Sequence, residues 1–418
     1  MFTTRFKARI FVLEGLNALA ASLYLNYLFF YMRHEFGFTN VGNLFLGSTS
    51  GFTYAVAAWV CGKFAQRHGY VLSLRIGFSL TATSLLAASA LHRVAGQYST
   101  MILWTVGMCF IWPAMEGILG ERETRERLQR YVGIYNIVWA SGTAIAYFLG
   151  GVLLEKLGPR SIFFVPLAIH VAQLVILGRK PYVSLTAYDD TPAGAVAASP
   201  EAQPRGSNAA PHPPVGRDRV PGGATRPSPN TFLAMAWIAN PFAYVAINSI
   251  IPVIPRLAER LQLSPMLAGF VCSVWFFARV AAFVGLWLWP GWHYRFRWLA
   301  SAYAAMLVCF ALILVAPNLW VLVLVQIVFG AAVGLIYYSS LFYSMDVGDT
   351  KGEHGGFHEA ALGLGIGVGP AVAAGSLCVF PAQPNANTWA VTLLLAGGLA
   401  WLMVLRWGRD HAKCAERR

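Results

Sequence analysis

The chain has 418 residues, of which 57% are hydrophobic and 12% are charged, and its mean hydropathy is +0.55. About 25% of the residues in an average soluble domain are charged, so this composition excludes an ordinary soluble protein. The net charge of +13 would suit nucleic acid, but the basic residues stand in short groups between apolar runs. We therefore expect a lipid bilayer around the chain and no nucleic acid as a partner.

The apolar runs predict how often the chain crosses the bilayer. A hydrocarbon core about 30 Å thick needs about 20 apolar residues in each helical span. Twelve such runs follow one another, at residues 10–32, 41–61, 71–91, 100–120, 131–154, 161–178, 231–254, 265–289, 298–316, 320–344, 356–380 and 388–407. The sequence therefore predicts an all-α membrane protein with twelve transmembrane helices.

The distribution of lysine and arginine predicts the orientation. With the N-terminus inside, the inner segments carry 23 of the 31 basic residues and the outer loops carry six. Cytoplasmic loops are enriched in these residues. We therefore expect a multi-pass protein of the cell membrane, inner or plasma, with both termini in the cytoplasm.

Residues 179–230 differ in composition from everything around them, because they hold 10 of the 22 prolines. Such a segment cannot bury a core, so we predict a disordered cytoplasmic linker. It separates an N-terminal six-helix bundle (1–178) from a C-terminal one (231–410), and a cytoplasmic tail (411–418) follows.

The two halves also resemble each other. An offset of 223 residues places Gly142 on Gly365 and Asn136 on Glu359. Repeated bundles are typical of alternating-access transporters, which bind their solute near the middle of the membrane between the repeats.

Three stretches resemble motifs of the major facilitator superfamily. The loop after the second span reads Gly62-Lys-Phe-Ala-Gln66-Arg67-His-Gly69 and is similar to the cytoplasmic loop motif of that family. The family's glycine and proline motif is matched in part by Gly142, Gly150 and Gly151, and again by Gly365, Gly369 and Pro370. Together with the twelve spans and the middle linker, these matches cover nearly the whole chain, which resembles a member of this superfamily.

The resemblance implies the major facilitator fold, with two six-helix bundles and a solute site between them. Where the family's loop motif has an aspartate that latches the halves, this chain has the neutral Gln66. The latch should be weaker here, or rebuilt from the acidic and basic cluster 121–130. In span 5 the glycine-proline motif is characteristic of drug–proton antiporters. This chain has Ala146-Tyr147 at that point, so export by antiport is not supported.

Arg279 is the deepest ionisable residue in a predicted span. It lies at least ten residues from either end, or about 15 Å or more at the helical rise, too far to reach the headgroups. Ionisable groups in spans are costly and are functional candidates by default. In the superfamily arrangement this span borders the central cavity, which implies a role in solute binding or coupling. The alternative is a structural partner for a carbonyl or a carboxylate.

Four further ionisable candidates lie near the cytoplasmic ends of spans. Glu14 and Glu116 are expected either to carry a proton during transport or to extend toward a basic loop. His358 and Glu359 fall in the first turn of span 11, where Glu359 is either a site residue or a cap that the helix dipole favours. His354 lies four residues before His358, a spacing at which two histidines could bind a metal, but this spacing alone is unspecific. We predict no metal and no other cofactor.

Neutral polar and aromatic residues on the spans that line the cavity in this family complete the predicted site. They are Asn17, Tyr24, Asn26, Trp112, Asn240, Tyr244, Asn248, Tyr337, Tyr338 and Tyr343. A cavity with a few polar groups among aromatic rings suits a small organic solute, while helix packing is the alternative for each residue. The glycines and the proline of the two motifs are expected to serve close helix packing.

The leading functional hypothesis is a monomeric secondary active transporter that moves a small organic solute by alternating access, with protons as a candidate coupling ion. The alternative is a membrane receptor or assembly factor that keeps the fold without transporting. The sequence contains no catalytic constellation, so we do not expect an enzyme. It leaves the solute, the coupling ion and the direction of transport open.

Overall fold

The computed structural model describes residues 4–121, 123, 125–178, 228–347 and 353–415, which form helices joined by short loops, with no strand among them. The first half of the described chain contains α1 (Thr4–Phe36), α2 (Asn40–His68), α3 (Tyr70–Ala90), α4 (Val94–Gly120), α5 (Arg125–Leu157) and α6 (Ser161–Leu177). The second half contains α7 (Pro229–Ile250), α8 (Ile254–Arg260), α9 (Pro265–Cys272), α10 (Val274–Leu288), α11 (Phe296–Val315), α12 (Leu319–Val347), α13 (Glu353–Val379) and α14 (Ala386–Ala415). The short 3-10 helices η1 (Ile251–Val253) and η2 (Pro290–Trp292) follow α7 and α10.

Local sequence explains where several helices begin. The hydroxyls of Thr39, Ser228 and Ser264 accept hydrogen bonds from the backbone at the starts of α2, α7 and α9. Such caps satisfy N–H groups that have no partner within the helix. Helix α7 starts with Pro229 and α9 with Pro265, and proline has no N–H to satisfy at the first helical position.

Two predicted spans are interrupted, which the apolar pattern did not reveal. The span predicted at 231–254 is regular helix only to Ile250, because Pro252 and Pro255 follow and proline removes a helical hydrogen bond. The span predicted at 265–289 breaks at Ser273, whose hydroxyl donates to the carbonyl of Phe270 at 2.7 Å. Hydroxyl bonding of this kind bends helices.

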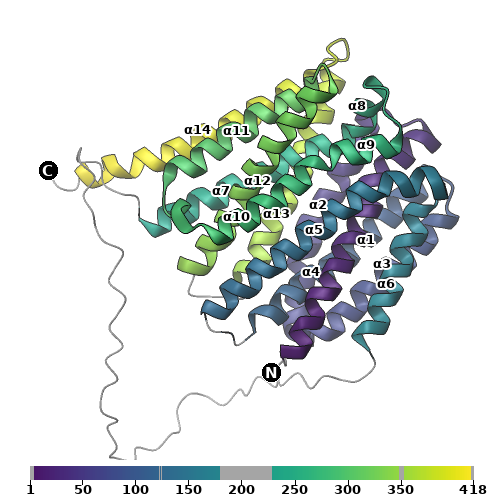
Figure 1. The fold of residues 1–418 in the computed structure, drawn as a ribbon, viewed down its shortest axis with the longest axis horizontal. Helices are drawn as coiled ribbons and strands as arrows, with labels where there is room; N and C mark the ends of the chain where they lie inside the picture. The colour runs from purple at the N-terminus through teal and green to yellow at the C-terminus, as the bar shows by residue number, and fades with distance from the viewer. Residues whose placement is uncertain (1–3, 122, 124, 179–227, 348–352, 416–418) are drawn as a thin grey trace, which may run out of the picture.

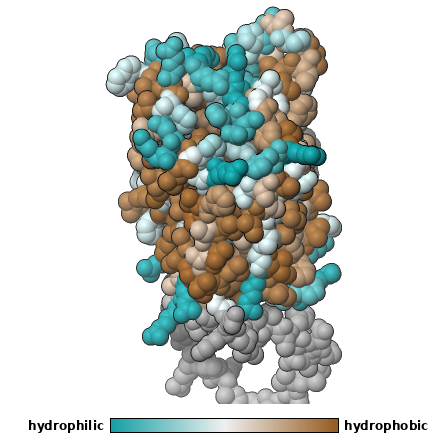
Figure 2. All heavy atoms as spheres, turned by 90° about the vertical axis from the view of Figure 1, so that its right-hand side faces the viewer, coloured by the Kyte–Doolittle hydropathy of each residue, from teal (hydrophilic) through white to brown (hydrophobic). Residues whose placement is uncertain are grey.

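The described helices match the dimensions of a bilayer. Eleven helical stretches are long and apolar enough to cross it, and α6 is a shorter apolar helix of 17 residues. Figure 2 shows a broad apolar band over one face of the molecule, with polar residues gathered above it and along its lower edge. The predicted linker 179–230 lies largely outside the described residues. Residues 411–418 were predicted as a tail beyond the last helix, but α14 continues to Ala415.

The helices associate mainly within each half of the chain. Helices α1–α6, here the N-terminal half, pack on one another, and so do α7–α14, the C-terminal half. The two halves lie side by side in Figure 1, drawn in purple to teal and in green to yellow. They meet chiefly where α2 packs on α13 and where α5 packs on α9 and α10.

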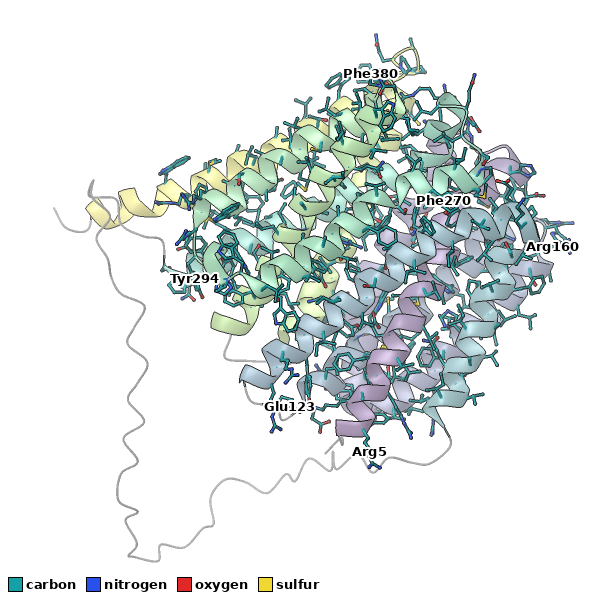
Figure 3. The ribbon with its side chains drawn as sticks, in the orientation of Figure 1. Arg5, Glu123, Arg160, Phe270, Tyr294 and Phe380 are labelled. Carbon is teal, nitrogen blue, oxygen red and sulfur yellow. The ribbon has the colours of Figure 1, made fainter. Side chains whose placement is uncertain are left out.

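The molecule has two ends that differ in how the halves meet. Arg5 and Glu123 mark the end at which the N-terminus lies, and Arg160 and Phe380 mark the other (Figure 3). We call these the terminal end and the turn end.

Polar contacts bridge the halves at the turn end. Asn43 of α2 donates to the carbonyl of Pro252 at 3.1 Å. Arg33 of α1 forms a two-bonded ion pair with Glu259 of α8, with Nη2 to Oε2 at 2.6 Å. These contacts join the two halves at the turn end, beside a pocket of about 470 Å³ that Arg33 and Glu259 line.

Glycines allow α13 to approach two other helices at once. A Cβ atom at Gly51 of α2 would lie 2.2 Å from the backbone nitrogen of Gly367. On another face of α13, a Cβ at Gly365 would lie 2.4 Å from the carbonyl of Pro241, and one at Gly369 would lie 2.6 Å from that of Val245. The predicted glycines Gly365 and Gly369 thus face α7 of their own half, and Gly367 faces α2.

Candidate functional site

Arg279 lies on α10 and its guanidinium reaches the boundary between the halves. The residue is 4% exposed. Its Cζ atom lies 4.5 Å from the centre of the Trp139 ring of α5, and 5.2 and 5.4 Å from the rings of Trp275 and Phe276. Ring faces attract a guanidinium electrostatically, so aromatic side chains from both halves hold this charge.

The hydrogen-bonding capacity of Arg279 is not met by the described residues. Its Nε and Nη2 atoms are buried and have no hydrogen-bond partner there. The ion pairs in the described part of the chain are Lys7 with Glu123, Arg33 with Glu259, and His34 with Glu35. None includes Arg279, so its fork of donors has no carboxylate.

Tyrosines surround the arginine at the same level. Tyr337 of α12 stacks on Trp139 across the boundary, with ring centres 5.5 Å apart and planes at 22°. Tyr244 of α7 lies 6.3 Å from Tyr337, and both tyrosines are within electrostatic reach of Arg279. Tyr244 and Tyr337 were predicted site residues, and the structure places them beside Arg279.

Three carboxyls form a second group, from α1, α4 and α13. Glu14, Glu116 and Glu359 lie within electrostatic reach of one another. The indole of Trp112 donates to Glu14 at 3.3 Å, and the hydroxyl of Tyr54 donates to Glu359. Because Tyr54 is on α2, this last hydrogen bond joins the two halves. The structure thus brings together three acids that the sequence could only name one by one.

The remaining predicted site residues are scattered. Asn17 and Asn240 are buried, and their amide atoms have no hydrogen-bond partner among the described residues. Asn26 is buried in α1. Tyr338 lies on α12 away from the carboxyls, and His358 falls in the part of α13 where side chains are not described.

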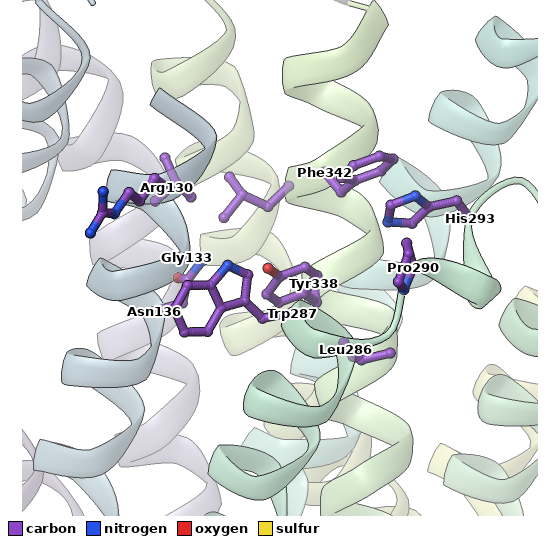
Figure 4. Close-up of a pocket in the computed structure, with 11 residues that line it drawn as sticks. Arg130, Gly133, Asn136, Leu286, Trp287, Pro290, His293, Tyr338 and Phe342 are labelled. Atoms are coloured by element: carbon purple, nitrogen blue, oxygen red, sulfur yellow. The ribbon is translucent and has the colours of Figure 1, made fainter. Parts of the chain in front are cut away.

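A pocket of about 360 Å³ lies between α5, α10 and α12 toward the terminal end (Figure 4). Trp287 of α10 and Tyr338 approach Gly133, where a Cβ atom would lie 3.7 Å from the Tyr338 hydroxyl. Asn136, whose amide has no hydrogen-bond partner among the described residues, lines the pocket. Because the pocket opens between the halves, it is a candidate route from the terminal end toward Arg279.

The predicted loop motif forms the turn between α2 and α3. Gly69 has a φ of 98°, which side chains other than glycine rarely adopt, and its N–H bonds the carbonyl of Ala65. Gln66 and Arg67 are exposed in the last turn of α2, while Gly62 is buried. In the neighbouring cluster 121–130, Glu123 pairs with Lys7 at 2.6 Å. That pair lies within the N-terminal half.

The glycines predicted on span 5 face three different neighbours. A Cβ at Gly142 would lie 2.8 Å from the carbonyl of Gly15 on α1, and one at Gly150 would meet the ring of Tyr27. At Gly151 it would lie 2.1 Å from the carbonyl of Pro265, at the start of α9. Helix α5 thus packs closely on both halves.

The sequence model of the Major Facilitator Superfamily matches residues 10–370. The chain belongs to this superfamily. It is therefore a multi-pass membrane protein of a transporter family. Among solved structures, that of a mutant of the nucleoside transporter NupG aligns with a TM-score of 0.65. The alignment covers 96% of this chain and 99% of that one, at 15% sequence identity, which shows a shared fold. No curated protein matches the sequence.

Some residues of the site were missed by the sequence prediction. Trp139 and Tyr54 carry no charge and resemble many other aromatic residues in apolar runs. Helical spacing offered one signal, because Trp139 lies one turn after Tyr135 and Asn136, and the repeat aligns Asn136 with Glu359. Residues three and four apart share a helix face. The face of α5 with Tyr135, Asn136 and Trp139 therefore corresponds, in the repeat, to the face of α13 that carries Glu359.

Proposed function

We infer that the protein is a secondary active transporter of a small organic solute, built from twelve transmembrane helices in two six-helix bundles. The observation that carries this proposal is the convergence of buried and partly buried ionisable groups from both halves on one boundary. Glu14 and Glu116 come from the N-terminal half, and Arg279 and Glu359 come from the C-terminal half. Charges are costly inside a membrane, and in transporters they mark solute and ion pathways. Alternating access would open and close this boundary from either side.

The basic residues support an orientation with the terminal end in the cytoplasm. In that orientation the contacts of Asn43 with Pro252 and of Arg33 with Glu259 join the halves on the outer side. The pocket between α5, α10 and α12 then lies on the cytoplasmic side. We propose that this is the inward-facing state of the cycle.

Protons are the proposed coupling ion. Glu14 and Glu359 are buried and Glu116 is partly buried. Three carboxyls in such a group cannot all ionise without strong mutual repulsion, so the group is suited to bind and release protons. The bond between Tyr54 and Glu359 crosses the halves and must break when α2 and α13 separate there. A proton on Glu359 would then be exchanged as the halves move.

The test is solute uptake by the purified full chain in proteoliposomes, with an inward proton gradient. The panel should hold organic acids, amines, sugars and nucleosides. Nucleosides are included because the structural neighbour is a nucleoside transporter and a nucleobase can stack on tyrosine and tryptophan. We expect saturable uptake that a protonophore reduces. Absence of saturable uptake over the whole panel would contradict transport and favour a receptor or assembly role.

The ion pair between Arg33 and Glu259 supplies a prediction about the outer side. Arg33→Glu should repel Glu259 and open this side more often, by about two- to fivefold, since an exposed pair contributes about 0.2–1 kcal/mol. The reporter is Leu263→Cys, in the outer pocket that both residues line. A membrane-impermeant maleimide should label it faster, in a Cys378→Ser background that removes an exposed thiol.

The double variant Arg33→Glu with Glu259→Arg is the matched control. It restores the attraction with the charges exchanged, so labelling should return to the original rate. Equal labelling rates in all three proteins would show that the pair does not help to close the outer side.

A further inference from the structure

The surroundings of Arg279 are more specific than those of a general polar group in a membrane. A guanidinium does not lose its proton at physiological pH, so its charge is permanent. The three rings around it stabilise the charge, but they accept no hydrogen bonds from the Nε and Nη2 atoms in the plane of the guanidinium. Buried donors without partners are costly. The site therefore needs an acceptor that the described side chains do not provide.

We propose that this acceptor is the carboxylate of the transported solute, and that the solutes are small aromatic monocarboxylates. This inference rests on the transport function proposed above. The planar fork of arginine binds a carboxylate through two parallel hydrogen bonds. Nε and one terminal nitrogen form one edge of that fork, and Nε and Nη2 are the two atoms without partners.

Two of the three clustered carboxyls have hydrogen-bond donors of their own, and neither donor is Arg279. Glu14 accepts from Trp112 and Glu359 accepts from Tyr54. Gly365 packs beside Tyr244, at the level of the arginine, and Glu359 lies six residues before it, about 9 Å along the helix axis. The cluster of three carboxyls and the arginine are thus two separate sites, one for a proton and one for an anion. A solute anion that moves together with a proton carries no net charge across the membrane.

The aromatic part of the solute is inferred from the rings beside the arginine. Trp139 and Tyr337 come from opposite halves and stack face to face, and Tyr244 lies next to Tyr337. All three are only partly buried. When the halves separate at this level, the faces of Trp139 and Tyr337 become available to a flat ring. Offset stacking stabilises such a contact beyond the burial of area.

The experiment is equilibrium binding to the purified full chain, measured by titration calorimetry with benzoate, phenylacetate and indole-3-acetate. The matched probes are phenylacetamide, which is neutral, phenethylamine, which is a cation, acetate, which lacks a ring, and uridine. We expect at least one aromatic acid to bind. Its neutral or cationic analogue should bind about ten- to a hundredfold more weakly, the range for one hydrogen bond to a charged group.

Variants of the arginine test the assignment of the anion. Arg279→Lys keeps the charge but loses the fork, and Arg279→Ala loses both, so each should weaken binding of the aromatic acid by about tenfold or more. Arg75→Lys is the control, because Arg75 lies in α3 and donates to the carbonyl of Gly178. It should bind as the parent does. Melting temperatures verify that each variant is folded. If Arg279→Ala does not fold, Arg279→Lys alone tests the assignment of the anion.

Three results would overturn the inference: no binding by any of the aromatic acids, equal binding of phenylacetamide and phenylacetate, or unchanged binding in Arg279→Lys. Transport of uridine or another neutral solute without binding of the acids would also overturn it while leaving the transport function intact. Binding that depends on Arg279, without uptake into proteoliposomes, would contradict the transport function alone.

Discussion

Replacing Gly51 by alanine should destabilise the protein strongly, because it adds a methyl group where the two halves are in backbone contact. The added Cβ would lie 2.2 Å from the backbone nitrogen and 2.4 Å from a backbone carbon of α13. Backbone atoms cannot rotate away, so α2 and α13 must separate. Overpacking of this kind costs about 1–3 kcal/mol or more. For a chain of 418 residues each kcal/mol corresponds to about 1 °C, so we expect the melting temperature to fall by roughly 1–3 °C or more.

The control for this prediction is Gly375→Ala on α13. No atom lies within 4 Å of a Cβ built at Gly375, so the same methyl group on the same helix should leave the melting temperature nearly unchanged. The measurement is thermal unfolding of the purified protein in one detergent. If the two variants melt alike, α2 and α13 do not cross as closely as described.

Replacing Glu359 by glutamine should abolish accumulation of solute driven by a proton gradient. Glutamine keeps the size of the side chain and can still bond Tyr54, but it cannot bind and release a proton. Accumulation of the aromatic acid that binds most tightly should fall to the level reached without a proton gradient. Exchange of internal for external solute, which needs no net proton movement, should continue.

Two further variants sharpen this test. Tyr54→Phe removes the hydrogen bond across the halves and keeps the carboxyl, so gradient-driven accumulation should persist. Glu35→Gln changes an acid near the turn end that pairs with His34, and it should behave as the parent protein does. If Glu359→Gln accumulates solute as well as the parent, the proton is carried by Glu14 or Glu116, or protons do not drive transport.

The sequence was sufficient to predict the helices because a membrane span is a property of about twenty consecutive residues. It was also sufficient to single out Arg279, since a charge in an apolar run is conspicuous by itself. The interruptions at Pro252 and Ser273 were missed because a hydropathy window averages over single residues.

Contacts between helices could not be derived in the same way. The glycine spacing on α13 indicates faces that permit close approach, but it does not reveal which helix lies against each face. The rotation of α13 depends on packing with α2 and α7 together. For the same reason Trp139 was not recognised, because its importance comes from α10, which lies beyond the linker in the sequence.

The shortness of α6 has a consequence for the lipids around the protein. Its 17 residues span only about 25 Å at the helical rise, whereas the hydrocarbon core is about 30 Å thick. Arg160 stands directly before its first residue, and Arg75 of α3 binds the carbonyl of Gly178 directly after its last. Charged groups at both ends prevent the helix from sinking deeper, so in the twelve-helix arrangement the adjacent acyl chains must shorten by local thinning. The edge formed by α3 and α6 should therefore gather short-chain lipids and favour thin membranes.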